Sequence, residues 1–92
     1  MVRSNETAQE VWKKGIVVSG FDSAEWRKDR CGAWISWNKY GDRNSIYGWE
    51  IHHIAGGEET EPLQWDNNVA TGDGRLTCVV TSSANKNIKK SS

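Results

Sequence analysis

The segment that most constrains the fold is residues 47–54, with the sequence Tyr-Gly-Trp-Glu-Ile-His-His-Ile. Apolar and polar side chains alternate here with the period of a half-buried β-strand. A strand in this position places Trp49, Ile51 and His53 on one face and the intervening side chains on the other. Ala-Gly-Gly at 55–57 ends the strand, so two adjacent histidines are expected to point in opposite directions near its end.

The residues after this strand predict a second extended segment and then a short helix. Pro62-Leu63-Gln64 is expected to be extended, because proline and the residue before it avoid the helical region. Residues 66–71 predict a short helix, and Gly72 follows them as its C′ residue. The predicted order is therefore strand, glycine loop, extended segment and helix.

Local signals predict four further elements around this unit. A capping box that begins at Thr7 predicts a helix over 8–14, and a second capping signature at Asp22 predicts another helix through Arg30. Strands are expected at 33–37 and 76–80. The domain then spans residues 7–81, between a disordered N-terminus at 1–6 and a polar, disordered tail at 82–92.

Six tryptophans must supply much of the core, because 92 residues make one small domain with limited apolar area. Trp34 and Trp37 are expected in that core, with stacking on nucleic-acid bases as the alternative. Trp49 and Trp65 are expected to pack the strand against the helix. The net charge is zero, and residues 46–75 carry one Arg against six Asp and Glu, which argues against tight non-specific binding of nucleic acid.

Location and redox state follow from what the sequence lacks. It has no signal peptide, no long apolar run and no lipidation motif, so a cytoplasmic protein without membrane contact is expected. Cys31 and Cys78 lack the paired spacing of a zinc site. In an intracellular chain both are expected to be reduced, with a structural disulfide between them as the alternative.

Three motifs together resemble those of a compact bacterial family of HNH endonucleases. They are W-R-K-D-R-C-G at 26–32, G-W-E-I-H-H-I at 48–54 and L-Q-W-D-N-N at 63–68. The resemblance implies an α+β domain with a small ββα-metal fold, an antiparallel hairpin packed against short helices. It also implies a metal-dependent nuclease that hydrolyses phosphodiester bonds in DNA. The sequence does not indicate an oligomeric state.

The resemblance implies roles for particular residues. His53 falls on the general base, while His52 and Asn68 fall on the two metal ligands. In such a site a neutral imidazole takes a proton from water while a divalent cation, here Mg, Mn, Ni or Zn, neutralises charge on the phosphate. The best candidates for contact with the nucleic-acid backbone are basic residues of the predicted second helix: Arg27, Lys28 and Arg30.

Three departures from the family pattern keep other interpretations open. His52 stands where the family has Asp, which shifts the expected metal preference toward ions that accept imidazole. The loop after the strand is short and acidic and lacks the Asn that orients the base, and Thr71 replaces a helix Lys. The alternatives are a catalytically degenerate HNH-fold module that acts as a binding domain, and a small zinc-stabilised domain. Asn67 is expected only to cap the helix.

Overall fold

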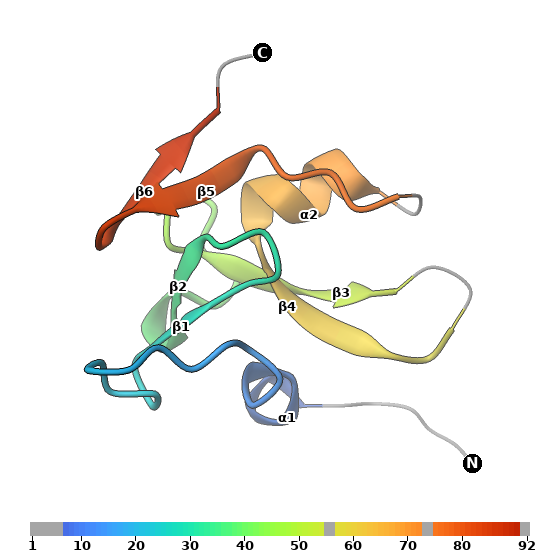
Figure 1. The fold of residues 1–92 in the computed structure, drawn as a ribbon. Coiled ribbons are helices and arrows are strands. Elements are labelled where there is room, and N and C mark those ends of the chain that lie inside the picture. The colour runs from blue at the N-terminus through green and yellow to red at the C-terminus, as the bar shows by residue number, and fades with distance from the viewer. Residues whose placement is uncertain (1–6, 55–56, 73–74, 91–92) are drawn as a thin grey trace.

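A computed structural model describes residues 7–54, 57–72 and 75–90 (Figure 1). The N-terminal segment 1–6, for which disorder was expected, lies outside the described residues. Two α-helices, one 3-10 helix and six strands make up the described chain. In order they are α1 (Ala8–Trp12), β1 (Trp26–Lys28), β2 (Trp34–Ser36), η1 (Trp37–Lys39), β3 (Trp49–His53), β4 (Thr60–Gln64), α2 (Trp65–Thr71), β5 (Val80–Ser83) and β6 (Lys86–Lys89).

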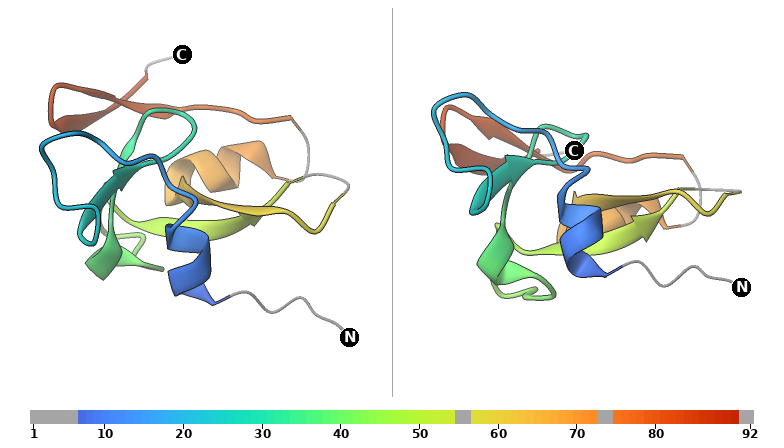
Figure 2. Two further views of the ribbon diagram at one scale, coloured as in Figure 1. Left: turned by 60° about the horizontal axis from the view of Figure 1, so that its bottom comes forward. Right: turned by 90° about the horizontal axis from the view of Figure 1, so that it is seen from below.

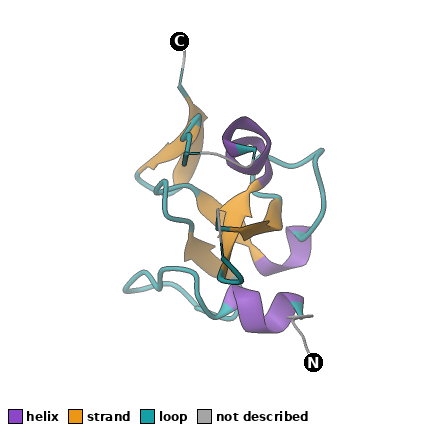
Figure 3. Cartoon of the chain, turned by 90° about the vertical axis from the view of Figure 1, so that its right-hand side faces the viewer, coloured by secondary structure: helices purple, strands orange, loops and turns teal. Residues whose placement is uncertain are grey.

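The strands form three antiparallel hairpins, β1–β2, β3–β4 and β5–β6, each a separate two-stranded sheet. Figure 3 shows strands, in orange, in the middle of the molecule between helical segments above and below, and further strands beside the upper helix. The expected α+β class, with antiparallel hairpins and short helices, is therefore confirmed.

The β3–β4 hairpin lies between the two α-helices (Figures 1 and 2). Helix α1 contacts β4 on one side, and α2 contacts both strands on the other. Trp49 is fully buried on the α1 side, in one cluster with Val11, Trp12 and Ile35. The expectation that Trp49 packs against α2 is wrong: its ring lies 5.2 Å from that of Trp12, measured between centroids.

Gly48 lets a loop fold back onto the start of β3. A Cβ atom at this position would overlap the carbonyl oxygen of Asp42, so any other residue would force the two backbone segments apart. The Gly48 carbonyl accepts a hydrogen bond from the Trp65 backbone N–H at 3.0 Å. The glycine therefore ties the loop and the first residue of α2 to the beginning of the histidine-bearing strand.

The first predicted helix is present but ends at Trp12 instead of residue 14, and the second predicted helix is wrong. The capping box of α1 is present, with the Thr7 hydroxyl accepting from the Glu10 N–H. At Asp22 the capping signature produces only a turn, in which the Asp22 carboxylate accepts from the Ala24 N–H at 2.9 Å. Residues 26–28 then pair with β2 as strand β1. Long-range strand pairing thus overrides the local helix signal.

The C-terminal segment differs from the tail that the sequence predicted. Residues 82–89 belong to the β5–β6 hairpin instead of a disordered tail, and the strand expected at 76–80 is β5, which begins at Val80. Residues 91–92 of the expected tail lie outside the described residues. Asn87 anchors this hairpin to β2: its amide accepts from the Trp34 N–H at 2.6 Å and donates to the Trp34 carbonyl at 2.7 Å. A polar residue therefore holds the segment in place, which hydropathy alone does not reveal.

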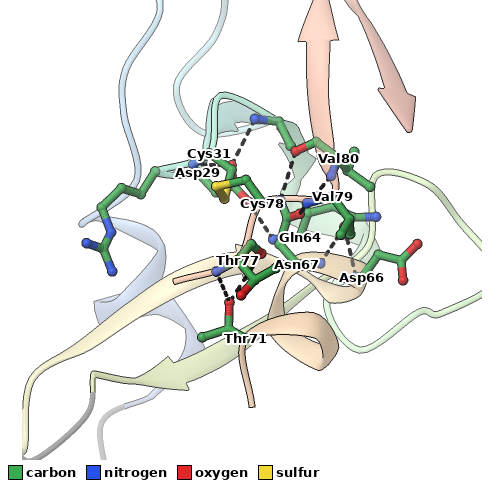
Figure 4. Close-up of a disulfide and its surroundings, with 12 residues drawn as sticks. Asp29, Cys31, Gln64, Asp66, Asn67, Thr71, Thr77, Cys78, Val79 and Val80 are labelled. Carbon is green, nitrogen blue, oxygen red and sulfur yellow. Dashed lines mark hydrogen bonds between the residues drawn. A yellow bond between two sulfur atoms is a disulfide. The ribbon is translucent and has the colours of Figure 1, made fainter. Parts of the chain in front are cut away.

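The two cysteines form a disulfide, so the expected reduced thiols are a wrong prediction (Figure 4). The bond joins Cys31, in the turn between β1 and β2, to Cys78, in the segment before β5, across 47 positions of the chain. Disulfides persist mainly in oxidising compartments. No helix in the described ranges is long and apolar enough to cross a membrane.

Candidate functional site

The structure brings the two predicted metal ligands together. His52 lies on the face of β3 that α2 covers and is only 5% exposed. Its Nδ1 lies 3.1 Å from the side-chain oxygen of Asn68, one turn into α2. The strand alternation predicted which face His52 occupies, and the short helix supplies its partner. These two side chains are the centre of the candidate site.

Glu50 and Arg43 extend the pair into a chain of four side chains. Asn68 Nδ2 donates to Glu50 Oε1 at 2.9 Å, and Arg43 makes two hydrogen bonds to the Glu50 carboxylate, at 2.6 and 2.9 Å. The Arg43 guanidinium lowers the pKa of Glu50, the Asn68 hydrogen bond acts in the same direction, and partial burial opposes both. Glu50 is therefore an ionised carboxylate close to the His52–Asn68 pair.

This chain fixes the tautomer of His52. Because Asn68 uses its Nδ2 to donate to Glu50, its oxygen is the atom that faces His52 and can only accept. The Nδ1 atom of His52 must therefore carry the proton, which leaves the lone pair of the neutral ring on Nε2. Within the described residues, Nε2 makes no hydrogen bond, and Trp49 Nε1 is the only buried side-chain nitrogen or oxygen without a partner. His52 Nε2 is consequently not sealed from solvent.

The donor atoms of the pair, an imidazole nitrogen and an amide oxygen, are of kinds that a divalent cation accepts, so His52 and Asn68 are the residues that would hold one. Binding there would move the imidazole proton to Nε2, and the nearby Glu50 carboxylate would favour positive charge. Among the described residues, no three His, Cys, Asp or Glu side chains form a cluster that could hold a metal ion.

The predicted base, His53, does not join this group. The β3–β4 register puts it opposite Thr60, on the face of the hairpin that faces α1, and its side chain is exposed. The Lys14 ammonium donates to the Thr60 hydroxyl at 3.0 Å. Directly opposed residues of an antiparallel pair have Cβ atoms about 5 Å apart. His53 therefore lies near a lysine that sequence analysis did not single out.

Each of the three basic residues proposed to contact nucleic acid makes a contact within the chain, and two of them, Lys28 and Arg30, line one pocket. Arg27 donates through Nε and Nη1 to backbone carbonyls at 2.9 and 3.0 Å. The Lys28 ammonium lies 4.9 Å from the centroid of the Trp34 ring, and Arg30 forms a two-point ion pair with Glu61. The helix expected to carry all three is absent from residues 22–30. Each cation thus serves an internal contact instead.

Asn67 holds the helix in place by a route other than capping. The N-cap of α2 is Gln64, whose side-chain oxygen accepts from two backbone N–H groups of the first turn. The fully buried Asn67 amide makes four hydrogen bonds: Nδ2 donates to Asp29 and to the Val80 carbonyl, and Oδ1 accepts from the Val79 and Val80 N–H groups (Figure 4). Asn67 therefore positions α2, and with it Asn68, against the chain on either side of the disulfide.

Glu50 and Arg43 belong to the candidate site but were not predicted from the sequence. Glu50 had a usable signal, because it lies two positions before His52 and so shares its face of the strand. Arg43 had none, because its loop reaches Glu50 only through the tertiary fold.

Comparison of the chain with protein-family models, with curated proteins and with solved structures finds no match.

Proposed function

We propose that the chain is an HNH-like, metal-dependent endonuclease that hydrolyses phosphodiester bonds in DNA. The observation that carries the proposal is the contact of 3.1 Å between His52 on β3 and Asn68 on α2. These residues come from the histidine pair and the W-D-N-N helix on which the family resemblance depends. The succession of β3, β4 and α2 supports the finer assignment of a ββα-metal fold.

In this proposal two side chains bind the metal ion and a third accepts a proton. His52 and Asn68 would hold Mg, Mn, Ni or Zn, and such an ion neutralises charge on the scissile phosphate when bound. His53 accepts a proton from the attacking water as the new oxygen–phosphorus bond forms and the bond to the leaving oxygen breaks. Lys14, held at Thr60 opposite His53, is placed to attract a phosphate on the same face.

A second candidate function is a degenerate HNH-fold module that binds a partner without cleaving it. The observation that favours it is the position of His53 on the opposite face of the hairpin from His52 and Asn68. The internal contacts of Arg27, Lys28 and Arg30 favour it as well. A base separated from the metal ligands loses rate, because proton transfer requires close and aligned groups.

Nicking of supercoiled plasmid DNA with each of the four ions tests the first candidate. We expect cleavage with at least one ion, its loss in His53→Ala and in Asn68→Ala, and its retention in Asn85→Ala, a matched change in the exposed turn between β5 and β6. Absence of cleavage with every ion would contradict the proposal. A folded protein that shows no cleavage and no metal-induced NMR shifts at His52 or Asn68 would instead support the degenerate module.

The cytoplasmic location expected from the sequence stays a prediction. The Cys31–Cys78 disulfide favours an oxidising compartment over the cytoplasm. Trapping the thiols of the protein from intact cells, followed by mass spectrometry, decides between the two, since a cytoplasmic protein would carry both cysteines reduced.

A further inference from the structure

A cavity of about 360 Å³ lies on the α1 side of the molecule. Gln9, Trp12 and Lys13 line it from α1 and its C-cap, while Arg27 and Trp37 complete the wall. The hairpin β3–β4 separates this side from α2 and Asn68 (Figure 2). The volume is within the range of small-molecule sites. The cavity is therefore distinct from the His52–Asn68 site.

Two tryptophans give the cavity a rigid aromatic wall. Trp12 is 4% exposed, and its indole N–H donates to the Ser23 carbonyl at 3.0 Å. Trp37 is half-buried, and its ring centroid lies 5.7 Å from that of Trp12 at an interplanar angle of 66°. The two rings support each other edge to face, so neither needs to reorganise to receive a flat ligand. A wall of this kind favours a ligand that contains an aromatic ring.

The polar groups around the cavity favour an anion. Lys13 is exposed and has no ion-pair partner among the described residues. Arg27 uses Nε and Nη1 for backbone carbonyls, which fixes its guanidinium at the cavity and leaves Nη2 without such a bond. No Asp or Glu of the described chain lines the cavity. An aromatic amino acid would bring its ammonium group between two cations, whereas a phosphate would be attracted by both.

We propose that this cavity binds a nucleotide, with its base against Trp37 and its phosphate at Lys13. The Gln9 amide, which forms no side-chain hydrogen bond within the described ranges, can donate to and accept from the edge of the base. A base bound in this way is unstacked from its neighbours, so the ligand is a free nucleotide or single-stranded nucleic acid. This site goes beyond the proposed nuclease activity, because it requires neither the metal nor cleavage.

Titration of the intact protein with adenosine monophosphate and with single-stranded oligo(dT) in EDTA tests the proposal, read by calorimetry and by NMR of the indole N–H signals. We expect saturable binding that shifts the Trp12 and Trp37 signals. Trp37→Leu should weaken it at least about fivefold, and Lys13→Glu about tenfold at low salt, less as salt rises. Lys86→Glu, the same charge change on β6, should leave affinity unchanged.

The outcomes separate this site from the nuclease proposal, because EDTA removes metal-dependent cleavage from the measurement. Equal weakening by Lys13→Glu and Lys86→Glu would show non-specific attraction and overturn the proposal, as would absence of saturable binding by the unmodified protein. Lys13→Glu changes an exposed side chain, so its result holds even if Trp37→Leu fails to fold. Binding of inorganic phosphate as tight as that of the nucleotide would overturn the stacking role of Trp37.

Discussion

Asn67 donates from Nδ2 to the Asp29 carboxylate at 3.0 Å, and this buried bond joins α2 to the turn that follows β1. The same carboxylate accepts from the backbone N–H groups of Cys31, Ala33 and Gln64. Burial raises the pKa of Asp29, although its hydrogen bonds act in the opposite direction. The two neighbouring asparagines therefore have different roles: Asn67 holds α2 in place, and Asn68 faces the candidate site.

Asn67→Ala is expected to lower the free energy of unfolding by about 3–5 kcal/mol. The change leaves the Val79 and Val80 N–H groups without their acceptor and removes one of the two donors to Asp29 Oδ2, which keeps the Gln64 N–H. Each buried group left without a partner costs about 1–3 kcal/mol. Urea denaturation at pH 7 measures the loss. Asn68→Ala is the matched control and should cost about 1 kcal/mol, because its hydrogen bonds to His52 and Glu50 are only partly buried. Equal costs for the two variants would contradict this division of roles.

Replacing both Cys31 and Cys78 by Ser is expected to destabilise the fold by about 4 kcal/mol. The disulfide closes a loop over 47 positions, and the entropy that such a loop removes from the unfolded chain gives this value. The same loss should appear in the unmodified protein on addition of a reductant, measured as a lower midpoint of thermal unfolding. If the reductant leaves the midpoint of the unmodified protein unchanged, the disulfide does not stabilise the fold.

Elements with complete local signals could be predicted from the sequence. Four such signals predicted the element next to them: the capping box at Thr7, the alternation before His53, the extended segment at Pro62 and the glycine after α2. Gly72 adopts φ +58°, a conformation that glycine accepts readily, and it ends the helix as expected. For these elements the tertiary fold agrees with the local preference.

The remaining elements depend on partners distant in the sequence. Residues 26–28 become a strand because β2 and Ile16 pair with them. Asn67 and Asn87 resemble ordinary polar residues, yet each is buried through bonds to backbone groups at least twelve positions away. In the candidate site, alternation and the family resemblance identified His52 and Asn68, whereas the loop that supplies Arg43 has no local pattern pointing to β3.

Acidification is expected to break the Arg43–Glu50–Asn68 chain below pH about 4.5. Hydrogen bonding to Arg43 lowers the pKa of Glu50 from its ordinary value of 4.5. Its contribution to stability is therefore present above that value and lost as the pH falls through the lowered pKa. Burial raises the pKa of Asp29, so protonation of Asp29 on acidification favours the folded state. This gain partly offsets the loss at Glu50 in the overall free energy of unfolding. The Glu50 carboxyl carbon should be followed directly by NMR.

Arg43→Ala provides the comparison for this titration. Without the guanidinium, the Glu50 pKa should rise, and the Asn68 amide protons should shift at a higher pH than in the unmodified protein. A Glu50 pKa at or above its ordinary value in the unmodified protein would show that the ion pair does not form in solution.

His52 is expected to hold its proton on Nδ1 when neutral and without metal, because the Asn68 oxygen beside it can only accept. Nitrogen-15 shifts of the two ring atoms distinguish the tautomers. Asn68→Ala should bring His52 toward a tautomer mixture like that of the exposed His53, which serves as the internal reference in the same spectrum.

Zn added to the unmodified protein should reverse the tautomer preference of His52, since an ion between His52 and Asn68 takes the Nδ1 lone pair and leaves the proton on Nε2. A His52 ring that already carries its proton on Nε2 before metal is added would contradict the orientation that Glu50 imposes through Asn68.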